Sequence, residues 1–95
     1  MKSYICIVEG KVTGDKVMGI TFQSWAKTVA DELGLKGWIR NVADGKAEIL
    51  LQGSPEDYAV FRERLKTEAP VPDLKNVTCN AMDYDKDHDH FETRG

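Results

Sequence analysis

The chain has 95 residues, a length that fits one domain with a modest hydrophobic core. Hydrophobic residues make up 41% and charged residues 31%, which is typical of a globular protein and excludes a disordered chain. The formal net charge of −3, from 13 basic and 16 acidic residues, argues against nucleic acid or an anionic membrane as the partner, so any anion site must be local.

The first part of the chain predicts a strand followed by an amphipathic helix. Residues 4–13 are rich in β-branched side chains, which is typical of a strand, and Gly14-Asp15 ends it. From Phe22 the apolar residues recur at intervals of three and four, as they do on one face of a helix. Thr21 is placed as the N-cap of this helix and Gly34 as the residue that ends it.

The middle of the chain predicts a β-hairpin. Residues 38–42 alternate as a strand that puts Arg40 and Asn41 on opposite faces. Asp44-Gly45 is a strong turn signal because glycine accepts the positive φ that tight hairpins need. Residues 46–53 then return as the partner strand.

The last part of the chain predicts a second helix and one or two strands. Ser54 is placed as the N-cap and Pro55 at the first helical position; the buried stripe is Tyr58, Phe61 and Leu65. Two prolines in APVPD break this helix. Residues 74–84 follow as a long strand, residues 85–90 as a solvated turn, and residues 90–94 as a short edge strand.

The order of these elements predicts the fold class. It is βαββαβ with room for a short fifth strand, which is the α+β, ferredoxin-like α/β sandwich, with two helices on one face of an antiparallel sheet. We expect a single domain over residues 1–95, without repeats or linkers. Since many unrelated functions use this fold, the function must be argued from the site.

Two cysteines, Cys6 and Cys79, fall in different predicted strands. The first residues show no secretory signal and no apolar run is long enough to span a bilayer, so we expect a cytoplasmic chain with two buried thiols. A disulfide would form only if the two strands were neighbours, which the sequence leaves open.

The segment KVMGITFQ, residues 16–23, has the features of an anion-binding loop. A helix N-terminus offers unpaired backbone amides and about half a positive charge, and a glycine-containing loop that leads into it can curl amides around an oxyanion. On these features alone an ordinary loop is the simpler interpretation. Asn41, 18 residues beyond Gln23, favours the anion site because an amide near the end of the next strand can orient a water, although it could also bond to the local backbone.

These residues resemble the acylphosphatase family. The family pattern runs G-R-V-Q-G-V-x-F-R, reaches the asparagine of G-W-V-R-N, and continues with D-G and a strand ending Q-G. This chain has DKVMGITFQ and then LKGWIRNVADGKAEILLQG at the same spacing. The resemblance extends from Tyr4 to about Phe91. It implies the same ferredoxin-like fold and the hydrolysis of acyl phosphates without a metal or organic cofactor.

Carried over by position, the resemblance assigns a role to each residue of the loop. The phosphate-binding loop falls on Lys16, Val17, Met18, Gly19 and Ile20, the water-orienting asparagine on Asn41, and the phosphate-binding arginine on Gln23. Gln23 is a departure from the family pattern, as are Met18 in place of glutamine and Asp15 in place of glycine. The scaffold motif GWIRN keeps the pattern apart from one conservative change.

The departures bear directly on the implied reaction. Hydrolysis of a carboxyl–phosphate anhydride requires that the phosphoryl oxygens are held and a water is aimed in line. Arginine supplies a forked, permanent charge and glutamine only a neutral amide, so the change should cost on the order of 10³-fold in rate. Two hypotheses follow: a weak acylphosphatase, or a catalytically inactive module of the same fold that binds a small anion or a protein partner.

Two weaker signals point to other classes of function. His88 and His90 alternate with acidic residues and could hold a metal, although a solvated turn is the simpler interpretation. Trp25, Trp38 and Phe61 could form a platform for nucleic acid, although their spacing suits a core. We therefore expect no metal, no nucleic acid and no membrane, and a monomer that acts on a small-molecule acyl phosphate or binds phosphate or another anion.

Overall fold

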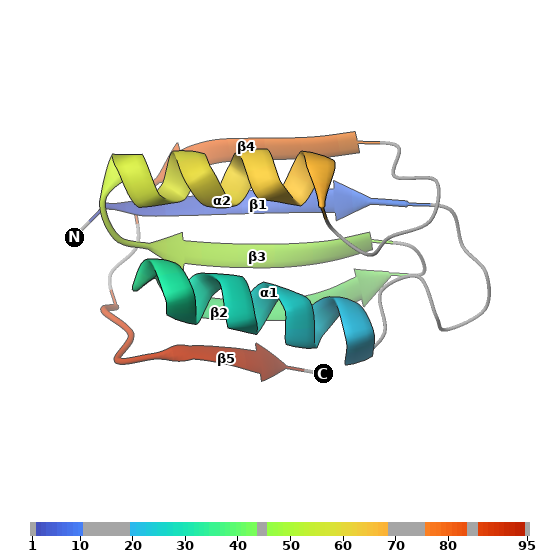
Figure 1. Cartoon of the computed structure of the whole chain (residues 1–95), viewed down its shortest axis with the longest axis horizontal. Helices are drawn as coiled ribbons and strands as arrows, with labels where there is room; N and C mark the ends of the chain where they lie inside the picture. The colour runs from blue at the N-terminus through green and yellow to red at the C-terminus, as the bar shows by residue number, and fades with distance from the viewer. Residues whose placement is uncertain (1, 11–19, 44–45, 69–75, 84–85, 95) are drawn as a thin grey trace.

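The structure is a computed structural model that describes residues 2–10, 20–43, 46–68, 76–83 and 86–94 (Figure 1). Its elements follow in the order β1 (Ser3–Glu9), α1 (Ile20–Leu33), β2 (Lys36–Ala43), β3 (Lys46–Gln52), α2 (Pro55–Thr67), β4 (Asn76–Met82) and β5 (Phe91–Arg94). The predicted βαββαβ order is confirmed, and the short fifth strand forms. The predicted turns at Gly14-Asp15 and Asp44-Gly45 lie outside the described residues.

All five strands form one sheet in the order β4-β1-β3-β2-β5. The neighbours among β1 to β4 pair antiparallel, as predicted. β5 pairs parallel to β2, which corrects the prediction of a wholly antiparallel sheet. The reason is topological: the connection after β4 brings the chain to the end of the sheet where β2 begins, so that Phe91 lies opposite Gly37.

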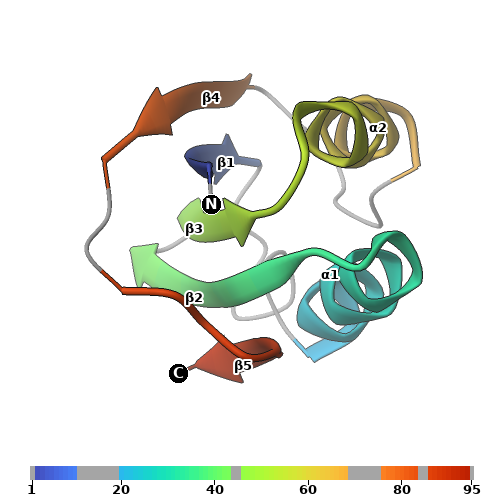
Figure 2. The same ribbon diagram turned by 90° about the vertical axis from the view of Figure 1, so that its left-hand side faces the viewer.

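Both helices cover the same face of the sheet, and Figure 2 shows the two layers end on. Alternation along β1 and β3 turns every second side chain toward the helices, where it meets the apolar stripes of α1 and α2. The buried stripe predicted for α2 is confirmed, and Tyr58 stacks on Tyr4 of β1 with ring centres 3.7 Å apart. The core contains Tyr4, Cys6, Val8, Phe22, Ala26, Val29, Ala30, Leu35, Ile39, Ala47, Ile49, Leu51, Tyr58, Phe61, Leu65 and Phe91.

The helix ends follow their capping residues, with one exception. The backbone N–H of Asp57 donates to the Ser54 side chain at 3.1 Å, which confirms Ser54 as the N-cap of α2. Gly34 adopts a φ of 70° directly after α1 and donates to the carbonyl of Asp31, so it ends the helix as predicted. Thr21 is not the N-cap of α1, because that helix already begins at Ile20.

Gly37 explains why a glycine precedes Trp38 in the GWIRN motif. Its φ is 133°, a backbone conformation that is strained for any residue with a Cβ. A Cβ at this position would also overlap the backbone carbonyl oxygen of Leu50 on the neighbouring strand. The glycine therefore lets β2 approach β3 closely at the start of the strand that carries Asn41.

Cys6 and Cys79 form a disulfide, so the expectation of two free thiols is wrong. β1 and β4 are neighbours, the two cysteines lie directly opposite each other, and their Cα atoms are 4.1 Å apart. The sequence left this open because strand adjacency is a property of the tertiary fold.

A buried glutamine holds the connection between β4 and β5. Gln52 is fully buried, and alternation along β3 directs it to the sheet face opposite the one on which Leu51 meets the helices. Its side-chain amide donates to the carbonyl of Lys86 at 2.6 Å and to the Ser3 hydroxyl at 3.1 Å. Its oxygen accepts the backbone N–H of His88 at 2.8 Å. The predicted solvated turn is therefore fastened to the sheet at residues 86–88.

Candidate active site

Three elements converge at one end of the molecule, and two of them carry the predicted site residues Gln23 and Asn41. Figure 1 shows the start of α1 and the ends of β2 and β5 at this end. Arg94, the last residue of β5, lies opposite Arg40, the residue before Asn41. The side-chain amide of Gln23, in the first turn of α1, donates to the backbone carbonyl of Arg94 at 3.4 Å. The end of β5 thus links the segments that carry Gln23 and Asn41.

The electrostatics of the two helices differ at their N-terminal ends. The first turn of α2 contains Glu56 and Asp57, and the Ser54 side chain occupies one of its free amides. The first turn of α1 contains no acidic residue. The positive end of the α1 dipole is therefore not offset by carboxylates of its own first turn, which suits an anion better than the start of α2 does.

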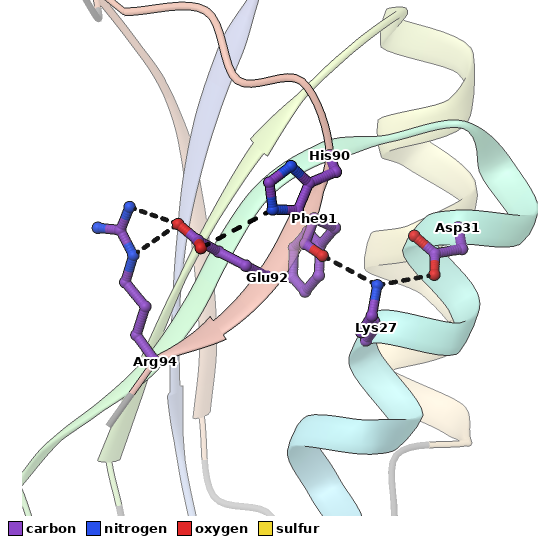
Figure 3. A network of polar contacts seen from close by, with 6 residues as sticks. All are labelled: Lys27, Asp31, His90, Phe91, Glu92 and Arg94. Atoms are coloured by element: carbon purple, nitrogen blue, oxygen red, sulfur yellow. Dashed lines mark hydrogen bonds and ion pairs between the residues drawn. The ribbon is translucent and has the colours of Figure 1, made fainter.

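Gln23 and Lys27, one turn apart on α1, both bond to the backbone of β5. The Lys27 ammonium donates to the carbonyl of Phe91 at 3.0 Å and pairs with Asp31 at 3.0 Å, as Figure 3 shows. Lys27 therefore holds the first residue of β5 and Gln23 holds its last residue, Arg94. Lys27 could not be recognised from the sequence, because an exposed lysine in a helix carries no signal of its distant partner.

The two nearby arginines lie on the face of the sheet away from the helices. The guanidinium groups of Arg40 and Arg94 lie 4.8 and 5.4 Å from the ring centre of Trp38. Arg40 pairs with Glu48 at 2.8 Å and Arg94 with Glu92 at 2.6 Å. Both guanidinium groups are thus engaged there, and neither replaces the charge that the family has at the position of Gln23.

Glu92 of β5 is held by the guanidinium group of Arg94 near this end of the sheet. Its Oε1 accepts two hydrogen bonds from Arg94, from Nε at 2.9 Å and from Nη2 at 2.6 Å (Figure 3). These bonds, followed by the positive charge of Arg94 itself, lower the pKa of the Glu92 carboxyl. His90 adds a longer contact to Glu92 at 3.8 Å.

The predicted site residues differ in how far the structure describes them. Ile20 is the first residue of α1, and Asn41 belongs to β2 opposite Ala47. Gln23 is half-buried and in contact with β5. Lys16, Val17, Met18 and Gly19 lie outside the described residues.

The weaker sequence signals do not assemble into other sites. Within the described ranges, no group of three or more His, Cys, Asp or Glu side chains is placed to hold a metal ion. Trp25 and Phe61 pack with the core under the helices, whereas Trp38 lies on the opposite face, so the three rings do not share a surface. None of the helices in the described part of the chain is long and apolar enough to cross a membrane.

Comparison with known proteins decides the family. A model of the acylphosphatase family matches residues 8–93. The chain belongs to the acylphosphatase family. The acylphosphatase of Paenarthrobacter aurescens is 35% identical over 81 residues, covering 85% of each chain. The acylphosphatase of Halorhodospira halophila is 33% identical over 78 residues, covering 82% of this chain and 79% of the relative.

A solved acylphosphatase confirms the fold. The crystal structure of acylphosphatase from Bacillus subtilis superimposes with a TM-score of 0.84 at 27% identity and covers 100% of both chains. The ferredoxin-like α+β sandwich predicted from the sequence is therefore the architecture of this family. The acylphosphatase-like function that the GWIRN and KVMGITFQ segments implied has the same support.

Proposed function

We propose that this chain hydrolyses acyl phosphates to a carboxylate and phosphate at the start of α1. The chain belongs to the acylphosphatase family, and the first turn of α1 and the end of β2 both lie against Arg94. This arrangement is the observation that carries the proposal. In this proposal the backbone amides of residues 16–20 bind the phosphoryl oxygens, and Asn41 orients the attacking water. No metal or organic cofactor takes part.

Positioning supplies most of the rate acceleration in such a reaction. The carboxylate is a good leaving group, so the chain needs to hold the phosphoryl group in line with the water and to stabilise its charge. The N-terminal end of α1, free of carboxylates in its first turn, provides part of that stabilisation. Gln23 provides at most a neutral hydrogen bond. We propose that turnover is consequently slow for the family.

A specific contact favours a second candidate function. The amide of Gln23 donates to the carbonyl of Arg94, so this side chain helps to hold β5 against α1. A protein in which that position has become structural could retain the loop as a binding site for phosphate or another small anion, without turnover. This second candidate is a binding module of the acylphosphatase fold.

Turnover of an aryl acyl phosphate tests the proposal and separates the two candidates. The native chain should release phosphate above the spontaneous rate, and Asn41→Ala should reduce kcat on the order of 10²- to 10³-fold, because the water is no longer oriented. The backbone pairing of residue 41 with Ala47 does not depend on the side chain, so the variant should fold. If the native chain bound phosphate but was no faster than Asn41→Ala, the binding module would be the correct assignment.

Two further expectations accompany the proposed activity. We propose that the chain works as a monomer in the cytoplasm, on a small-molecule substrate. Sedimentation at micromolar concentration tests the first part, and fractionation of cells that express the tagged chain tests the second.

A further inference from the structure

The disulfide occupies the centre of the pairing between β1 and the edge strand β4. Cys6 and Cys79 are each the fourth residue of a seven-residue strand, and they lie directly opposite each other. Their Cα separation of 4.1 Å is that of an antiparallel pair whose side chains stand close together. We propose that Cys6–Cys79 is a reversible redox site, at which a dithiol reductant opens the covalent link between β4 and the rest of the sheet.

The two sulfur atoms differ in accessibility, which determines where a reductant attacks. Cys6 is completely buried in the core on a strand with neighbours on both sides. Cys79 is only partly buried and lies on β4, whose sole partner strand in the described sheet is β1. An incoming thiolate can therefore approach Cys79 from the edge of the sheet, whereas Cys6 can be reached only through the core.

The exchange is balanced in two steps. A thiolate of the reductant bonds to the Cys79 sulfur, and the bond to Cys6 breaks, so that Cys6 leaves as a thiolate and takes a proton from water. The second thiol of the reductant, as its thiolate, then attacks the reductant's first sulfur, which is bonded to Cys79 in the mixed disulfide. Cys79 leaves and is protonated, while the reductant departs as a disulfide. Two electrons and two protons have passed to the chain.

Reduction should loosen the edge strand and leave the fold intact. β1 stays paired with β3 along its whole length, and the backbone ladder between β1 and β4 does not require the sulfur bond. The disulfide, however, joins residues 73 positions apart, so its loss restores much conformational freedom to the unfolded chain. A reducing compartment would keep the chain in this looser form, and oxidative conditions would close it.

Native-state reduction with dithiothreitol tests the proposal. After oxidation the folded chain should accept no alkylating reagent, and after reduction without denaturant Cys79 should be alkylated ahead of the buried Cys6. The Tm of the reduced chain should fall by about 10–20 °C, with recovery on reoxidation. Two alkylated cysteines in the oxidised preparation, reduction that requires denaturant, or an unchanged Tm would each overturn the proposal.

A matched pair of variants tests the predicted point of attack. Cys6→Ala leaves only the edge thiol and Cys79→Ala only the core thiol, and neither variant can form the link. An aromatic disulfide reagent should modify Cys79 in the first variant at least about tenfold faster than Cys6 in the second. Equal rates would contradict attack at the edge. Because these tests read thiols and Tm, their outcome is independent of the proposed hydrolysis.

Discussion

Gln23 is the residue on which the rate of the proposed reaction depends most. It lies in the first turn of α1, half-buried, and its side-chain amide donates a long hydrogen bond of 3.4 Å to the carbonyl of Arg94. Replacement by arginine would add a permanent, forked charge at the positive end of the helix, where three phosphoryl oxygens are to be held. We predict that Gln23→Arg raises kcat/KM for an aryl acyl phosphate on the order of 10²- to 10³-fold.

Gln23→Leu is the matched control for this prediction. It removes the bond to Arg94 without adding charge, and it should lower Tm slightly and leave the rate close to that of the native chain. If Gln23→Leu raised the rate as much as Gln23→Arg, release of β5 would be the cause, and the charge argument would be wrong.

Glu92 makes the stability of the chain depend on pH in the acidic range. The hydrogen bonds from Arg94 lower its pKa in the folded state, so the pair stabilises the fold fully above the unfolded carboxyl pKa of about 4.3. That contribution is lost as the pH falls through the lower folded-state pKa. We expect the Tm values of the native chain and of Glu92→Gln to differ at about pH 7 and to approach each other as the pH is lowered to roughly 3.

The change on the other side of the pair provides the comparison. Arg94→Gln removes the donor of both bonds, so it should likewise differ most from the native chain at neutral pH and least in acid. Parallel curves for Glu92→Gln and the native chain would show that the bonds to Arg94 do not stabilise the fold.

At the level of elements, the connection between β4 and β5 depends on one buried side chain. Gln52→Leu would keep the volume of the side chain but leave the carbonyl of Lys86 and the N–H of His88 without their partner. We predict a loss of about 2–3 kcal/mol in the free energy of unfolding, measured with urea, because buried polar groups are costly when unsatisfied. Ser3→Ala, which removes only the hydroxyl contact of Gln52, should cost less than half as much.

The same elements show what the sequence can and cannot predict. Alternation and helical periodicity placed all four long strands and both helices, because each pattern reflects the contact of one element with the core. The buried contacts of Gln52 could not be predicted, since its partners lie 34, 36 and 49 positions away and give no local signal. The parallel pairing of β5 was not predicted and the disulfide was left open for the same reason: both depend on which strands become neighbours.

At the level of the whole molecule, the candidate site is assembled from segments far apart in the chain. The spacing between Gln23 and Asn41 was visible in the sequence, and the structure adds that β5 lies against both of their elements. The contact of Gln23 with Arg94 could not be predicted, because the two residues are 71 positions apart. The motif thus predicts a role for Gln23, and only the fold shows the contact that its side chain makes.

The proposed reaction requires that a phosphoryl group binds at the start of α1. A titration of isotope-labelled protein with inorganic phosphate, followed by amide chemical shifts, would detect this binding. We predict saturable shifts concentrated in residues 16–23 and at Asn41, with smaller changes at Arg94, and no comparable change at the capped start of α2 around Ser54 to Asp57. Shifts centred on α2, or an absence of saturable shifts at residues 16–23, would show that the phosphoryl group does not bind at the start of α1.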